Sequence, residues 1–107
     1  MSDMSFHLLI SAFNACDYYR DQKISLEGLR QHIWNLHFTL NSVMYRELRE
    51  FLQISESALE TIFCTFDDDK IYDSVMPIVS NIKKHISPYI NVMKHKLYDD
   101  WPFEEYK

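Results

Sequence analysis

The chain of 107 residues is 47% hydrophobic, 15% aromatic and 25% charged, and its formal net charge is −5. This composition excludes a disordered chain, and the length allows one hydrophobic core but not two. No apolar run reaches the about 18 residues of a membrane span, and no signal-peptide pattern begins the sequence. We therefore expect a cytoplasmic protein without a membrane partner.

The scarcity of glycine predicts the fold class. Gly28 is the one glycine in the sequence, whereas tight β-hairpins and strand turns usually recruit glycine or Asn-Gly pairs. We therefore expect an all-α protein, a compact helical bundle of about five helices. Residues 1–98 should form a single helical domain, and residues 99–107 should form an extended acidic and aromatic C-terminal tail.

Apolar residues recur every three or four positions through residues 6–40. This spacing predicts a first helix over about 5–19, which ends in the charged turn "RDQK", and a second helix that Ser25 can cap. The buried face of the second helix should consist of Leu26, Leu29, Ile33, Leu36 and Leu40.

Two further helices are expected in the middle of the chain. Asn41 and Ser42 offer the cap of a third helix that runs to about Gln53. After a turn at "QIS", Ser57 and Glu60 have the spacing of a capping box and predict a fourth helix. Its apolar face should contain Leu59, Ile62, Phe63 and Phe66.

The apolar period continues from Ile78 to Leu97, in a segment that two prolines interrupt. Pro77 fits the first turn of a helix, where its missing N–H costs nothing. Pro88 removes an internal hydrogen bond and introduces a ring clash, which together cost about 3 kcal/mol. We expect either a helix that restarts at Ser87 and Pro88 or a kinked helix of constant direction.

The patterns of enzymes and metal sites are missing. One glycine cannot build a phosphate-binding loop, and neither G-x-S-x-G nor H-E-x-x-H occurs. The acidic segment fails the EF-hand pattern because Ile71 and Tyr72 occupy a ligand position and the glycine position. The histidines are not spaced as i, i+4 ligand pairs. We expect no enzymatic activity, no cofactor and no metal. Cys16 and Cys64 are expected as reduced thiols buried in the core, with a disulfide between them as the alternative.

Two segments invite a nucleic-acid interpretation. "LREFLQISESALETIF" has the layout of a helix-turn-helix, but Glu56 and Glu60 would face the phosphates and be repelled, so an antiparallel helix pair is expected. "NIKKHISPYINVMKHK" is basic and interleaved with apolar residues, which leaves RNA binding open. We favour a solvated helix face balanced against the acidic segments, and therefore no direct nucleic-acid contact.

Negative charge is concentrated in two segments that also carry aromatic residues. Residues 47–73 hold eight acids and two bases, and residues 99–107 hold four acids and one base. Carboxylates speed the encounter with a basic protein, and buried aromatic anchors slow its dissociation. The alternative for the first segment is a solvated loop that caps the following helix. The alternative for the second is a tail that packs on the core. The candidate partner-binding residues are Asp67, Asp68, Asp69, Tyr72, Asp73, Asp99, Asp100, Trp101 and Glu104.

The stretch "DQKISLEGLRQHI", residues 21–33, together with the small size, acidity and helicity of the chain, resembles the immunity proteins that neutralise bacterial toxin nucleases. The similarity is to the helical colicin D type and the contact-dependent growth inhibition types, although Leu29 stands where an aromatic residue is common. The resemblance implies a tight inhibitor without enzymatic activity. It assigns no site residue, because members of that group use different surfaces.

The sequence thus predicts an immunity protein that covers the basic cleft of a cognate toxin nuclease. The nuclease expected first is an RNase. A basic cleft is expected in such an enzyme because it must hold phosphates, and an acidic surface competes for the same field. We expect a monomer that forms a 1:1 complex. The alternatives are a phage-type acidic inhibitor of a host nuclease and a helical adaptor or regulatory domain.

Overall fold

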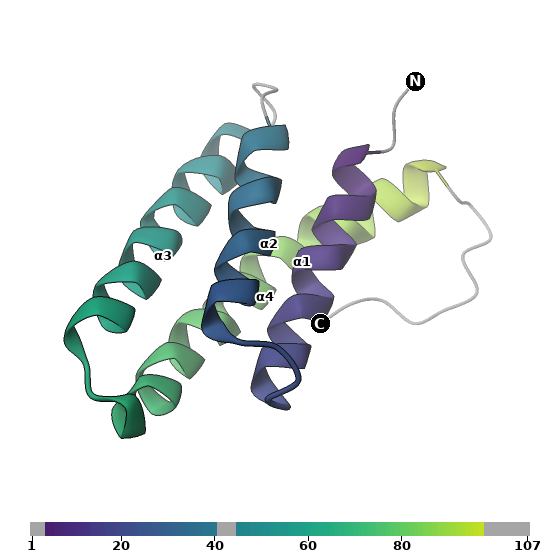
Figure 1. Ribbon diagram of the computed structural model, residues 1–107. Coiled ribbons are helices and arrows are strands. Elements are labelled where there is room, and N and C mark those ends of the chain that lie inside the picture. Colours follow the sequence, from purple (N-terminus) through teal and green to yellow (C-terminus); the bar gives the residue numbers. More distant parts are fainter. Residues whose placement is uncertain (1–3, 41–44, 98–107) are drawn as a thin grey trace.

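The computed structural model describes residues 4–40 and 45–97, with side chains described for residues 6–40 and 45–93 (Figure 1). Four helices make up these residues: α1 (Met4–Arg20), α2 (Leu26–Thr39), α3 (Arg46–Thr65) and α4 (Asp68–Leu97). The described ranges contain no strand, so the all-α fold class is confirmed. None of the helices in them is both long and apolar enough to cross a membrane.

Three helices lie side by side, and the fourth crosses behind them (Figure 1). The central helix of this layer, α2, packs against α1 on one side and α3 on the other. The long helix α4 runs diagonally across one side of the layer and packs against both α1 and α3. Every helix therefore has two neighbours, and one core lies between the layer and α4.

The core draws apolar side chains from all four helices. They repeat every three or four residues along each helix, which places them on one face. The largest fully buried side chains are Phe6, Leu9, Leu29, Ile33, Leu36, Leu40, Leu48, Leu52, Leu59, Ile82 and Ile86.

The predicted start and buried face of α2 are confirmed. The backbone N–H of Gly28 donates to the Ser25 hydroxyl at 3.0 Å, so Ser25 is the N-cap. All five residues of the predicted stripe from Leu26 to Leu40 are buried. Local capping chemistry and apolar spacing agree here with the packing.

The C-terminus of α1 closes on a residue that is not glycine. Gln22 has a φ of 61°, in the left-handed region that glycine usually occupies. The N–H of Lys23 bonds the carbonyl of Tyr18 at 2.7 Å, and the N–H of Gln22 bonds that of Tyr19 at 2.9 Å. This pair of bonds is a Schellman motif, and it turns the chain back toward α2 within the predicted "RDQK" turn.

The predicted division between a third and a fourth helix is wrong, because α3 continues through "QIS" without a break. The buried positions Leu48, Leu52, Ser55, Leu59 and Ile62 follow the helical period across the whole segment. Ser55 belongs to that face, and no glycine or proline interrupts it. Residues 4–40 and 45–97 therefore contain four helices and not the five expected, and the helix-turn-helix layout is absent from this segment.

The predicted start of the last helix is also wrong. The helix begins at Asp68, so most of the acidic segment is helical, and Pro77 lies inside α4. Pro88 lies inside as well, in a helix that does not restart. Both prolines are exposed, on the solvent side where a lost hydrogen bond is best tolerated. The carbonyl that Pro88 leaves free, that of Lys84, receives a long hydrogen bond of 3.5 Å from the Ser87 hydroxyl.

Candidate protein-binding surface

The acidic residues of the α3–α4 junction point into solvent. Asp67 lies between the helices, Asp68 and Asp69 are in the first turn of α4, and Asp73 is one turn further on. All four side chains are exposed, and within the described residues none of them forms an ion pair or a side-chain hydrogen bond. Neighbouring Lys70 is exposed too and pairs with none of them. The junction therefore presents negative charge that the described part of the chain does not neutralise.

Part of this charge has a local structural reason. Carboxylates in the first turn of a helix interact favourably with the positive end of its dipole, typically by about 0.3–1 kcal/mol each. Asp68 and Asp69 occupy that turn of α4. Asp67 directly precedes the first helical residue, and its carbonyl accepts the N–H of Lys70 at 2.9 Å, so it stands at the N-cap position, where aspartate is also favoured. The helix start thus accounts for three of the carboxylates, whereas Asp73 lies one turn further on.

Two phenylalanines beside the carboxylates are more exposed than the sequence predicts. Phe63 and Phe66 were expected on the buried face, but their exposed fractions are 46% and 44%. The buried face of α3 ends at Ile62, and α3 itself ends at Thr65, with Phe66 as the C-cap. Both residues therefore lie at the end of the helix, beyond its last buried residue, and Phe66 directly precedes Asp67.

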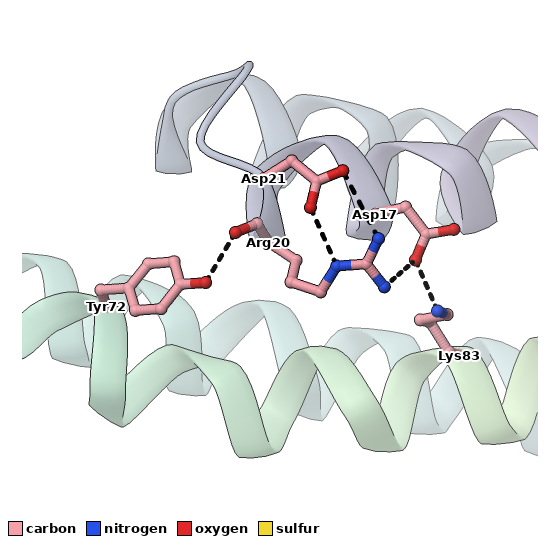
Figure 2. Close-up of polar contacts among 5 residues, drawn as sticks. All are labelled: Asp17, Arg20, Asp21, Tyr72 and Lys83. Carbon is pink, nitrogen blue, oxygen red and sulfur yellow. Dashed lines mark hydrogen bonds and ion pairs between the residues drawn. The ribbon is translucent and has the colours of Figure 1, made fainter.

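Tyr72 is held within the molecule. Its hydroxyl donates to the carbonyl of Arg20 at 2.6 Å (Figure 2). Its ring stacks on that of Tyr19, with the centroids 5.7 Å apart. It is half-buried, in contrast to the exposed aspartates around it. The residue that was predicted as a partner anchor thus joins α4 to the end of α1.

A second group of charged residues extends this connection along α1 and α4 (Figure 2). Asp17 accepts hydrogen bonds from Lys83 at 2.5 Å and from Arg20 at 3.2 Å, and Arg20 also bonds Asp21 at 3.1 Å. The Lys83 ammonium lies 4.9 Å from the ring centroid of Phe13. The hydrogen bond from Arg20 lowers the pKa of Asp21. Two cations balance two carboxylates, so this cluster connects helices and offers no net charge to a partner.

The remaining predicted site residues, Asp99, Asp100, Trp101 and Glu104, lie outside the described residues. Of the nine candidates, the structure brings together the four junction aspartates. The structure adds Phe63 and Phe66 to this candidate surface, because both are exposed where α3 ends.

A groove between α2 and α3 is a feature that the sequence did not reveal. Its volume is about 310 Å³, and its lining residues are Glu27, Arg30, Gln31, Trp34, Glu56 and Glu60. The guanidinium of Arg30 bonds Glu56 at 2.9 Å and lies 4.0 Å from Glu60. The same guanidinium lies 5.9 Å from the ring centroid of Phe63, which joins the groove to the α3–α4 junction.

The wall of the groove on α2 carries a partly exposed indole. Trp34 is 39% exposed, stacks on His37 at 5.3 Å and meets the ring of Phe38 edge-on at 4.9 Å. Phe38 is itself 64% exposed. The stack on His37 covers one face of the indole, and the contacts with both rings limit its rotation, while Trp34 also lines the groove.

The two cysteines differ in burial, and two of the described histidines bond the backbone of their own helices. Cys16 is buried and Cys64 is exposed, both as free thiols, so the expectation that both are buried is wrong for Cys64. Burial, the largest effect, raises the pKa of Cys16 to about 12. His32 and His85 donate from Nδ1 to the backbone carbonyls of Gly28 and Asn81. Over the described ranges, no group of three or more His, Cys, Asp or Glu residues is arranged to hold a metal ion.

No model of a known protein family matches this chain, and no curated protein or solved structure is significantly similar to it.

Proposed function

We propose that this protein is a stoichiometric inhibitor that binds a basic nuclease through the α3–α4 junction, in the manner of an immunity protein against a bacterial toxin RNase. The observation that supports this function best is the junction itself. Four exposed carboxylates without partners among the described residues lie beside two half-exposed phenylalanine rings.

The two kinds of side chain have separate roles in this proposal. Charges at the rim of an interface act mainly on the association rate, which they raise by steering a partner of opposite charge. Aromatic rings that become buried contribute to the lifetime of the complex, because their contacts are lost only on dissociation. Asp67, Asp68, Asp69 and Asp73 would supply the first effect, and Phe63 and Phe66 the second.

Inhibition follows from the nature of the target. A nuclease cleft has to be positively charged to hold phosphates, so an acidic surface seated on it competes directly with the substrate. The inhibitor needs no chemistry of its own, which agrees with a structure whose conspicuous features are charge and exposed rings.

The test is an inhibition assay with a candidate nuclease, taken from a reading frame next to the gene, at equal stoichiometry and with association rates measured at several salt concentrations. In Asp68→Asn/Asp69→Asn, association should be about three- to tenfold slower at low salt and less dependent on salt. Phe66→Ala should mainly accelerate dissociation. Unchanged rates in both variants would remove the junction from the interface.

A matched control with the same change in charge lies at the other end of α3. Glu47 and Glu50 are exposed and belong to the first turns of that helix. At a rise of about 1.5 Å per residue, they lie roughly 20–27 Å from the end of α3 at the junction. Glu47→Gln/Glu50→Gln should therefore have a much smaller effect on association. Equal effects of the two double variants would show that net charge, and not the junction, steers the partner.

Gene context separates the immunity function from its alternatives. A toxin reading frame next to the gene supports an immunity protein, and a phage operon supports an inhibitor of a host nuclease. Binding to the nuclease without loss of its activity would favour an adaptor domain instead.

A further inference from the structure

We propose that the groove between α2 and α3 holds one basic side chain, an arginine or a lysine, of the protein partner. This inference rests on the proposed function, because it identifies a second contact with the same partner. It assigns the groove a cationic ligand, held between the Trp34 indole and the carboxylates of Glu27 and Glu60.

The charges in the groove favour a cation. Arg30 directs both Nε and Nη2 to one oxygen of Glu56 at 2.9 Å, and its side chain is only 20% exposed. It is therefore already neutralised and is a poor site for an anion. Glu60 is 59% exposed and lies 4.0 Å from Arg30, and Glu27 is exposed with no ion pair in the described part of the chain. Three carboxylates and one guanidinium line the groove, which leaves an excess of negative charge.

The shape of the groove suits a long, narrow group. A volume of about 310 Å³ lies at the lower end of the roughly 300–1,000 Å³ found for ligand pockets, so one extended side chain fits better than a large ligand. A guanidinium or ammonium over an indole face gains a cation–π interaction of about 0.5–2 kcal/mol, depending on its desolvation. Because His37 and Phe38 already restrict Trp34, little side-chain entropy is lost when the cation enters.

The position of the groove explains how one partner reaches both contacts. Phe63 lies beside Arg30 at the edge of the groove, and Phe66 and Asp67 follow it along the chain. A partner seated on the junction could therefore extend one basic side chain along α3 into the groove. The junction then attracts many basic surfaces, whereas the groove selects those with a protruding cation.

A peptide with one arginine tests the groove without knowledge of the partner. The probe is acetyl-Gly-Arg-Gly-amide, and the neutral control is the same peptide with citrulline, which has nearly the same shape. Binding is followed by NMR at the indole N–H of Trp34, which a Trp101→Phe variant distinguishes from the other tryptophan. The arginine peptide should give a saturable shift with a dissociation constant on the order of 10 mM, and the citrulline peptide should not.

Two double variants with the same change in charge locate the site. In Glu27→Gln/Glu60→Gln, affinity for the arginine peptide should be about tenfold lower. Asp68→Asn/Asp69→Asn should keep the wild-type shift at Trp34, and far-UV circular dichroism should show both variants folded. The inference is overturned if no saturable shift occurs, if citrulline binds equally, if an acidic peptide binds instead, or if the two variants behave alike.

Failure of this inference and failure of the proposed function give different results. If the wild-type protein does not inhibit the nuclease but binds the arginine peptide, the inhibitor function is refuted and the cation site is retained. Inhibition by the wild-type protein without any arginine binding would refute the cation site alone.

Discussion

Replacing Tyr72 by phenylalanine removes one hydrogen bond between α1 and α4 and leaves the ring contacts in place. The Tyr72 hydroxyl donates to the Arg20 carbonyl at 2.6 Å. The carbonyls of Asp17, Tyr18 and Tyr19 receive backbone N–H groups of the turn that follows α1. Since the last carbonyls of a helix have no partner inside it, the phenol completes the hydrogen bonding of this helix end.

The expected cost follows from this geometry. A neutral hydrogen bond contributes about 0.5–1.5 kcal/mol net, because water bonds both groups in the unfolded chain. The ring stack on Tyr19, with centroids 5.7 Å apart, survives in Tyr72→Phe. We therefore expect the free energy of unfolding to fall by about 1 kcal/mol, which lowers the Tm by roughly 4–8 °C in a domain of this size.

Urea denaturation followed by circular dichroism measures this difference. Tyr18→Phe is the matched control, because Tyr18 is 49% exposed and its hydroxyl has no hydrogen bond among the described residues. The control should unfold like the wild type. A Tyr72→Phe variant as stable as the control would refute the assignment of Tyr72 to the connection between α1 and α4.

The same variant separates stability from binding. If the hydroxyl serves the fold, inhibition of the nuclease by Tyr72→Phe should remain at the wild-type level below its melting temperature. Weaker binding at unchanged stability would place the hydroxyl in the partner interface instead.

Four further predictions concern the backbone and the thiols. Gln22→Gly should stabilise the protein by about 0.5–1 kcal/mol, because the φ of 61° suits glycine. Gly28→Ala should raise the free energy of unfolding by a similar amount, measured by thermal unfolding, because the added Cβ makes only ordinary van der Waals contacts at 3.6 Å. Gln53→Gly should cost about 1 kcal/mol if α3 is continuous and almost nothing if "QIS" is a turn. Cys64 should react quickly with a thiol reagent at pH 8, and Cys16 should react only on unfolding. Because burial raises the pKa of Cys16 to about 12, the free energy of unfolding should also fall as the pH rises above about 9.0, where only the thiol of the unfolded chain ionises.

The first half of the bundle could be predicted from the sequence because its signals are local. The stripe from Leu26 to Leu40 and the cap at Ser25 each involve residues within a few turns of one another. Such patterns require no knowledge of distant neighbours. The end of α1 was placed correctly at "RDQK", although nothing in that turn indicated that Gln22 adopts the left-handed conformation.

The boundaries in the second half were missed because local signals competed with packing. Ser57 and Glu60 have the spacing of a capping box, yet the buried stripe through Ser55 keeps α3 continuous. Pro77 and Pro88 each weaken a helix, yet Val75, Val79, Ile82, Ile86 and Ile90 remain buried on one face of α4. The contacts of α4 with α1 and α3 outweigh the local cost of both prolines.

From the sequence alone come the helical class, the heptad-like stripes and the accumulation of carboxylates at residues 67–73, because composition and spacing are properties of the chain itself. Tertiary structure decided which of those features face outward. Tyr72 bonds Arg20 across 52 positions, and Arg30 meets Glu56 across 26. Pairings over such distances depend on how helices cross, which no local pattern records.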